Sequence, residues 1–234
     1  MRIICFPYAF GNSTLYSEFG EIFSEPYKIE SLDYPGHGQR VSDKLLFKID
    51  EIVDDAFNLI RDKLSVPYCL FGYSMGGLVV YELCILIQKM GLPMPKHIFI
   101  LGTPAPSIKR VYRDYENYGL EDVRRTLNKY GETPKELLEC DDMIEYMIPS
   151  VKADLIALRD YSCNKKDLLS FGKNVTVIRG CLEPDSILCR KEWKKFLGND
   201  CEFLIEKGNH FFMFKNGRKM LEKIRDIVME RAEK

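Results

Sequence analysis

Residues 72–76 read Gly-Tyr-Ser-Met-Gly, a pattern in which a serine stands between two glycines. Such glycines let a strand turn sharply into a helix, and the turn exposes the serine hydroxyl on a strained bend. The residues before the pattern, 68–71, predict a strand, and the almost wholly apolar run 78–90 predicts a buried helix. Because this strand-turn-helix setting is the one that the chemistry requires, Ser74 is predicted to be a nucleophile rather than an ordinary turn residue.

A serine nucleophile needs a base, and one histidine is well placed to supply it. The hydroxyl is a poor nucleophile near neutral pH unless an adjacent histidine takes its proton and a carboxylate orients that histidine. Of the three histidines, His97 opens an apolar strand and is expected to be structural, whereas His37 lies in the turn 35–38 and is expected to stabilise it. His210 follows the strand predicted at 202–205 and is therefore the predicted base.

Two carboxylates lie in the turn after the strand predicted at 174–178. When a serine elbow, an acid and a histidine act together on a sheet of this kind, they follow one another along the chain in that order. Glu183 and Asp185 both lie between Ser74 and His210. The turn alone leaves the choice between them open, and the carboxylate that is not used is expected to be a solvated loop charge.

Acyl transfer at a serine also needs backbone N–H groups that stabilise the developing oxyanion. Met75, the residue after the nucleophile, is predicted to supply one of them. The second is expected from the loop after the first strand, residues 7–12, where Ala9 is the candidate. The alternative for that loop is a bend with no catalytic role.

The elements that must position these residues alternate along the chain. Short apolar runs that favour strands occur at residues 3–6, 27–32, 68–71, 97–101, 174–178 and 202–205. Apolar residues recur at helical spacing over 52–64, and the tail 219–234 is typical of a closing amphipathic helix. This alternation predicts an α/β fold with a mostly parallel sheet of about six or seven strands.

The segment 104–173 interrupts the alternation because it contains no convincing strand over a length far beyond an ordinary connection. Helices are predicted at 119–130, 133–139, 141–148 and 151–161. We expect them to make up three or four short helices that form a lid over the carboxyl ends of the strands, where open α/β sheets bind ligands, within a single domain of residues 1–234. The alternative is a helical bundle packed elsewhere with no role at the site.

Composition excludes several classes of protein. Lys plus Arg number 34 and Asp plus Glu number 35, so a net charge of −1 provides no general basic field for nucleic acid or an anionic membrane. No run approaches the ~18 apolar residues of a membrane span, and the apolar start is too short for a signal peptide. The eight cysteines form no C-x-x-C pair and are expected to be reduced core residues. A cytoplasmic protein is predicted.

Motifs along nearly the whole chain resemble those of the stand-alone type II thioesterases that accompany polyketide synthases and nonribosomal peptide synthetases. The matching segments are 6–9 with F-P-[YH]-A-G-G, 32–37 with the L-P-G-R turn, 70–76 with L-F-G-H-S-M-G and 208–212 with G-x-H-F-F. In the lid, 131–134 and 153–161 are similar to G-x-T-P and A-D-F-x-L-x-x-Y. These lid motifs distinguish the family from generic esterases.

The chain departs from the family pattern at three positions. Phe10 replaces the first of the paired glycines and is expected to narrow the mouth of the site, and Tyr73 replaces the common histidine in a change expected to be neutral. Glu183 stands where the family has the aspartate of G-x-x-D-P. The resemblance therefore implies Glu183 as the acid, with Asp185 as the alternative if the turn is shifted.

The resemblance implies an α/β-hydrolase fold and hydrolysis of acyl groups from the phosphopantetheine thioester of acyl or peptidyl carrier proteins. No metal or dissociable cofactor is implied, and a monomer is expected. Two alternatives remain: a carboxylesterase of small molecules, and a catalytically weak module that binds carrier proteins. Basic residues of the lid are candidates to meet an acidic carrier protein, namely Lys109, Arg110, Arg113, Arg124 and Arg125.

Overall fold

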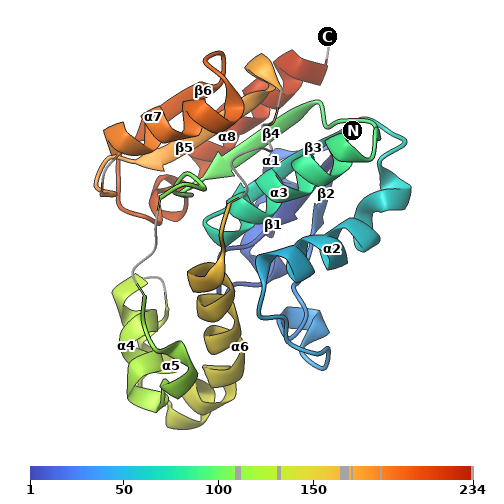
Figure 1. Ribbon diagram of the computed structural model, residues 1–234. Helices are drawn as coiled ribbons and strands as arrows, with labels where there is room; N and C mark the ends of the chain where they lie inside the picture. Colours follow the sequence, from blue (N-terminus) through green and yellow to red (C-terminus); the bar gives the residue numbers. More distant parts are fainter. Residues whose placement is uncertain (109–111, 131–132, 164–168, 170, 185, 233–234) are drawn as a thin grey trace.

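A six-stranded sheet forms the centre of the molecule (Figure 1). The computed structural model describes residues 1–234 apart from 109–111, 131–132, 164–168, 170, 185 and 233–234. The strands are β1 (Arg2–Phe6), β2 (Lys28–Ser31), β3 (Tyr68–Tyr73), β4 (His97–Leu101), β5 (Val175–Gly180) and β6 (Glu202–Glu206). Their order is β2-β1-β3-β4-β5-β6 and every neighbouring pair is parallel, which confirms the predicted α/β class.

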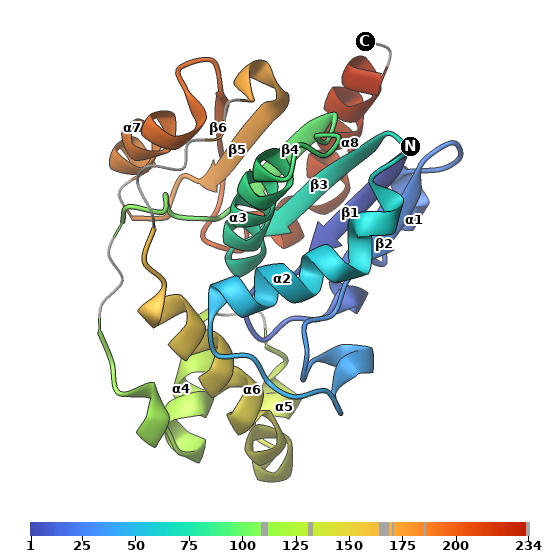
Figure 2. The ribbon, with the colours of Figure 1, turned by 45° about the vertical axis from the view of Figure 1, so that its right-hand side comes forward.

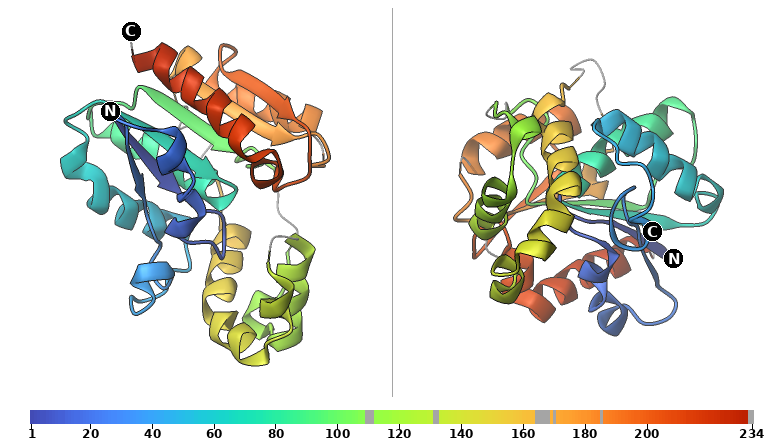
Figure 3. Two further views of the ribbon diagram at one scale, coloured as in Figure 1. Left: turned by 180° about the vertical axis from the view of Figure 1, so that it is seen from behind. Right: turned by 90° about the horizontal axis from the view of Figure 1, so that it is seen from below.

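Helices cover both faces of the sheet because the central strands are buried on both sides. Helices α2 (Ile49–Ile60), α3 (Met75–Lys89) and α7 (Ser186–Leu197) pack on one face, and α2 and α3 stand in front of the strands in Figure 2. Helices α1 (Phe19–Ile22) and α8 (Phe212–Ala232) cover the other face, seen from behind in Figure 3. The helix α8 begins earlier than the predicted 219–234 and contains a break at Gly217.

Short 3₁₀ helices complete the connections: η1 (Ser13–Tyr16), η2 (Gly38–Arg40), η3 (Arg61–Lys63), η4 (Tyr115–Asn117) and η5 (Gly172–Asn174). Among the described residues, no helix combines the length and the apolar character needed to cross a membrane.

In the described part of the segment between β4 and β5, three α-helices project from the sheet as a separate layer (Figures 1 and 3). They are α4 (Leu120–Tyr130), α5 (Lys135–Leu138) and α6 (Asp141–Asp160). They share a small apolar core of their own, in which Val123 and Leu127 of α4 pack against Val151 of α6. The first residues of the predicted G-x-T-P motif, 131–132, lie outside the described residues.

The expectation of three or four short helices is met by three, but the division into separate ranges 141–148 and 151–161 is wrong, because in the described structure α6 runs unbroken through Pro149. Proline removes one backbone donor from a helix, but packing of the turns on both sides offsets that loss here. Ile144 precedes the proline and Val151 follows it, and both are buried in the core of this layer. Pro134 is the cap that precedes α5.

The expectation that all eight cysteines are core residues is wrong for part of the set. Cys5, Cys69, Cys84, Cys189 and Cys201 are buried, whereas Cys163 is half-buried. Cys140, the cap that precedes α6, and Cys181, in the turn after β5, are exposed.

Candidate active site

Ser74 lies at the sharp turn between β3 and α3, in a conformation that an ordinary turn would avoid. Its φ of 55° and ψ of −110° place a non-glycine residue in a rarely populated region, which costs free energy. Two glycines make the turn possible. A Cβ on Gly72 would lie 2.2 Å from the carbonyl oxygen of Gly76, and a Cβ on Gly76 would lie 2.2 Å from the carbonyl oxygen of Phe6.

His210 reaches Ser74 from the loop after β6. The Nε2 atom of His210 lies 3.0 Å from the Oγ atom of Ser74. On the other side of the ring, Nδ1 lies 2.8 Å from Oε1 of Glu183. Since a carboxylate can only accept, Nδ1 carries the proton, and in the neutral imidazole Nε2 is then the acceptor for the serine hydroxyl.

Glu183 is held in the turn after β5, where its side chain is nearly inaccessible to solvent. Its Oε2 atom accepts a hydrogen bond of 2.8 Å from the backbone N–H of Gly180, which leaves Oε1 for His210. The buried guanidinium of Arg179 lies 3.5 Å from Oε1 and offsets the carboxylate charge. Asp185, the alternative acid, lies outside the described residues.

The two candidate oxyanion donors, the N–H groups of Ala9 and Met75, lie near the close contact between the start of α3 and the loop after β1. Met75 is the first residue of α3, where N–H groups have no partner within the helix. Gly76 brings this helix end against the carbonyl groups of Phe6 and Pro7, at the start of the loop that carries Ala9. Within the described part of the chain, the N–H groups of Ala9 and Met75 donate to no protein acceptor.

The remaining histidines lie in other surroundings. His97 is buried in β4, with Nε2 2.8 Å from the hydroxyl of Thr176 on β5. His37 is also buried, and its Nδ1 atom lies 3.1 Å from the carbonyl oxygen of Pro35, as expected for a ring that stabilises its turn. Its Nε2 atom lies 3.1 Å from Asp154 of α6, a contact that sequence reasoning did not find.

A cavity of about 600 Å³ opens beside Ser74 and His210. One side is formed by the loop after β1 and the turn 36–38, and the other by the helices α4 to α6. The apolar residues that these helices contribute are Leu127, Leu137, Met143, Met147 and Leu158. The inserted helices therefore form one wall of the cavity that contains Ser74.

Tyr73 makes contacts at the site, although its replacement of the family's histidine was expected to have no effect. Its hydroxyl donates to the carbonyl oxygen of His210, and its ring packs edge-on against that histidine at a centroid distance of 6.0 Å. The ring also stacks on Phe211 at 6.3 Å. The aromatic run that follows His210 was the signal that could have indicated this cluster.

Phe10, which replaces a glycine of the family pattern, has an unusual backbone conformation and a side chain that packs against two cores. Its φ of 69° lies in the region that favours glycine, so a residue with a side chain at this position carries a conformational cost. Its side chain packs partly against the main core and partly against the core of the inserted helices. It lines the cavity.

Comparison with known proteins places this geometry in a family. The chain matches the thioesterase domain over residues 1–228. The gramicidin S biosynthesis protein GrsT of Aneurinibacillus migulanus is 25% identical over 223 residues, which cover 95% of this chain and 86% of that protein. The medium-chain S-acyl fatty acid synthase thioesterase of Homo sapiens is 26% identical over 229 residues, covering 95% of this chain and 84% of that protein.

Solved structures agree on the fold. The RedJ thioesterase from the prodiginine pathway of Streptomyces coelicolor superposes with a TM-score of 0.83 at 22% identity, covering 98% of this chain and 85% of that chain. The type II thioesterase BorB from the borrelidin cluster gives a TM-score of 0.83 at 23% identity, covering 96% and 91%. With its six parallel strands and its match over residues 1–228, the chain belongs to the thioesterase domain family of hydrolases.

Proposed function

We propose that this protein is a serine thioesterase that releases acyl groups from the phosphopantetheine thioester of acyl or peptidyl carrier proteins. In this role it edits stalled or misprimed modules of polyketide or nonribosomal peptide synthases. The observation that carries the proposal is the continuous chain of hydrogen bonds from Ser74 through His210 to Glu183, at 3.0 Å and 2.8 Å. Such a chain activates a serine for acyl transfer.

In the acylation step, Nε2 of His210 takes the proton of Ser74 while Oγ forms a bond to the thioester carbonyl carbon. The negative charge moves to the carbonyl oxygen, which accepts hydrogen bonds from the N–H groups of Ala9 and Met75. The carbon–sulfur bond then breaks, and the proton on Nε2 passes to the sulfur. Pantetheine leaves as a thiol, and the acyl group stays on Ser74 as an ester.

In the deacylation step, His210 takes a proton from a water molecule whose oxygen attacks the ester carbonyl. The second oxyanion occupies the same pair of donors. Collapse returns the proton to Oγ of Ser74 and releases a carboxylic acid. Glu183 holds the Nδ1 proton in place throughout and stabilises the imidazolium that forms in each step. No metal or dissociable cofactor takes part in the proposed steps.

The cavity suits an acyl chain attached at Ser74, because its wall on the side of α4 to α6 is largely apolar. We assign the segment 104–173 the part of a lid that shapes this space. We also propose that the protein works as a monomer, in keeping with proposed steps whose groups all come from one chain.

The names of relatives support the choice of substrate class. The GrsT relative is described as a biosynthesis protein of gramicidin S, and BorB is described as a type II thioesterase of a biosynthetic cluster. A partner with an acidic face could meet Arg113, which is exposed. Arg124 pairs with Asp141 and Arg125 pairs with Asp122, so their charges are partly neutralised. Lys109 and Arg110 lie outside the described residues.

The test compares the same acyl group on a carrier protein, on free pantetheine and in a simple ester. We expect the highest kcat/KM for the acyl-carrier protein, and we expect Ser74→Ala to abolish turnover while Ser107→Ala keeps it. Ser107 is the matched control because its hydroxyl donates to Glu192, away from the cavity. Mass spectrometry after treatment with a fluorophosphonate should place the label on Ser74.

Three results would contradict the proposal in different ways. Equal kcat/KM for carrier-bound and free pantetheine thioesters would remove the carrier protein from it. A preference for the simple ester would favour a small-molecule carboxylesterase. Binding of acyl-carrier protein without turnover, and without a label on Ser74, would favour a binding module.

A further inference from the structure

The β1 loop, residues 7–11, is held by hydrogen bonds at the residues before and after Ala9 in the sequence. The hydroxyl of Tyr34 donates to the carbonyl oxygen of Pro7 at 3.0 Å, and the N–H of Gly11 donates to that of Tyr8 at 3.0 Å. The N–H of Phe10 donates to Oδ2 of Asp154 at 2.7 Å. The position of the Ala9 N–H is therefore set by its neighbours.

Asp154 differs from the other anchors of this loop because it comes from α6, which is more than a hundred residues away in sequence. Its side chain is almost completely buried, at 1% exposure. A buried carboxylate costs free energy unless it is paired and hydrogen-bonded. Both requirements are met at one oxygen, because Oδ2 also lies 3.1 Å from Nε2 of His37.

The contact with Phe10 fixes a backbone that would otherwise relax. Phe10 has a φ of 69°, which is unfavourable for a residue with a side chain. Such conformations persist only where their surroundings hold them. Rotation of Phe10 out of this region would break its bond to Asp154 and would turn the adjoining peptide, which contains the N–H of Phe10 and the carbonyl of Ala9.

We propose that Asp154 is a positioning residue of the oxyanion hole, which fixes the direction of the Ala9 N–H through its hydrogen bond to Phe10. The inference rests on the proposed function, since it takes Ala9 as an oxyanion donor. The carboxylate of Asp154 belongs to α6, and the same helix also forms part of the cavity wall. A displacement of α6 would disturb the oxyanion hole as well as the acyl pocket.

The experiment compares Asp154→Ala, which leaves no acceptor for the N–H of Phe10, with Asp160→Ala, a matched substitution later in the same helix. Asp160 pairs with Arg159 and is half exposed, at 51% of its side chain, so it serves as the control. Two quantities are measured. One is kcat and KM for an acyl-pantetheine, and the other is the affinity for an alkyl boronic acid, which forms a tetrahedral adduct with a serine hydroxyl and so imitates the oxyanion.

For Asp154→Ala we expect kcat and boronate affinity to fall together, by about 10- to 100-fold, because a small misplacement of a donor is costly. KM should change by less than about threefold. Asp160→Ala should match the wild type in both measurements. A merely structural role would lower the melting temperature of Asp154→Ala without moving either quantity in the folded protein, and that result would overturn the proposal.

Asp154→Glu covers the case in which the alanine variant does not fold. It keeps a negative charge opposite His37 but moves the carboxylate relative to the N–H of Phe10. We therefore expect kcat and boronate affinity to fall together again, but by a smaller factor. Unchanged boronate affinity in this variant would overturn the proposal. If the wild type binds boronate at Ser74 but hydrolyses no acyl thioester, the proposed function fails while the comparison of boronate affinities still tests Asp154. A wild type that binds no boronate contradicts both.

Discussion

The hydroxyl of Tyr73 donates to the carbonyl oxygen of His210 and so links the end of β3 to the loop after β6. Tyr73 precedes Ser74, and its bond partner belongs to the residue whose ring reaches Ser74 at 3.0 Å. The two ends of the proposed proton-transfer step are thus held together by a second contact, made through the backbone. Among the described residues, Phe211 and Phe212 add ring contacts to the same side chain.

Tyr73→Phe should therefore lower kcat while KM stays nearly constant. The lost hydrogen bond is expected to cost about 1 to 3 kcal/mol of stability and to loosen the loop that carries His210. Tyr68→Phe is the matched control, because Tyr68 lies on the same strand and its hydroxyl donates to the carbonyl oxygen of Pro93 at 2.7 Å. Both variants should lose stability, but only Tyr73→Phe should lose turnover. Equal turnover in the two would show that the contact is structural only.

Glu183→Gln should reduce kcat by about 10⁴-fold, the loss that follows when the orienting charge is removed and the histidine adopts the wrong tautomer. Asp185→Asn should leave kcat near the wild-type value. Both variants are to be assayed on one acyl-pantetheine at one pH. The reverse pattern would assign the acid to Asp185, and near-normal turnover in both would show that this turn does not hold the acid.

Gly76→Ala should both destabilise the protein and reduce turnover. Its Cβ would lie 2.2 Å from the carbonyl oxygen of Phe6 and 2.6 Å from that of Pro7, so α3 and the β1 loop would have to separate. Overpacking of this kind costs roughly 1 to 3 kcal/mol. Since it also moves Met75 relative to Ala9, we expect kcat to fall about 100-fold.

Gly20→Ala provides the control for this substitution. Gly20 lies in α1, and an added Cβ there meets nothing within 4 Å. Chemical denaturation should show little change or a small gain in stability, because alanine favours a helix over glycine by about 1 kcal/mol. If Gly76→Ala behaved in the same way, the close approach of α3 to the β1 loop would not matter for function.

The sequence predicted the parts of the fold that depend on local pattern. The strand-turn-helix setting of Ser74 and the alternation of strands and helices follow from residue spacing, and both are present. The unbroken course of α6 through Pro149 could not be predicted, because local propensity favours a break there. Tertiary packing around Ile144 and Val151 decides that element instead.

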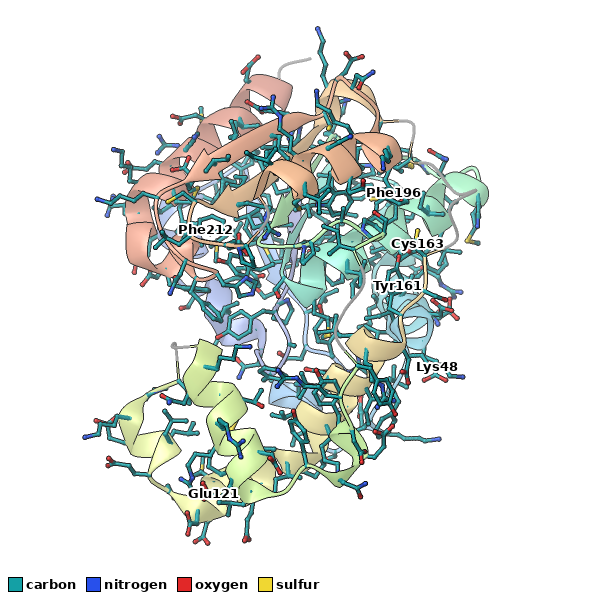
Figure 4. The ribbon with its side chains drawn as sticks, turned by 60° about the vertical axis from the view of Figure 1, so that its left-hand side comes forward. Lys48, Glu121, Tyr161, Cys163, Phe196 and Phe212 are labelled. Carbon is teal, nitrogen blue, oxygen red and sulfur yellow. The ribbon has the colours of Figure 1, made fainter. Side chains whose placement is uncertain are left out.

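The contacts of Asp154 could not be predicted from the sequence, for a different reason. Its partners Phe10 and His37 are separated from it by 144 and 117 residues, so no local spacing relates them. The segment 153–161 marked the residue only as part of a motif. Figure 4 shows why the pairing depends on tertiary structure: α6 returns from the far end of the inserted layer, where Glu121 lies, to the body of the protein near Tyr161.

His37 gives the link between α6 and the turn 35–38 a dependence on pH. Nδ1 faces the carbonyl oxygen of Pro35 and Nε2 faces the carboxylate of Asp154, so both nitrogens donate only when the ring is charged. Burial works to lower the pKa of His37, but Asp154, helped by the bond to Pro35 and the charge of Asp33, raises the pKa above its ordinary value. The phenol of Tyr34 also faces the ring, at a centroid distance of 6.1 Å.

His37→Gln should therefore cost more stability in mild acid than in mild base. A group whose pKa is raised by folding stabilises the folded state fully below its unfolded pKa of about 6.5, and this contribution is lost as pH rises through the folded pKa. Hydrogen bonds to charged groups are worth about 1.5 to 3 kcal/mol, which sets the expected difference between wild type and variant at pH 6. Urea unfolding of both proteins between pH 6 and pH 9 measures that difference directly, and other titrating groups cancel because they are common to both. A difference that stays constant or grows toward pH 9 would show that His37 is neutral when it contacts Asp154.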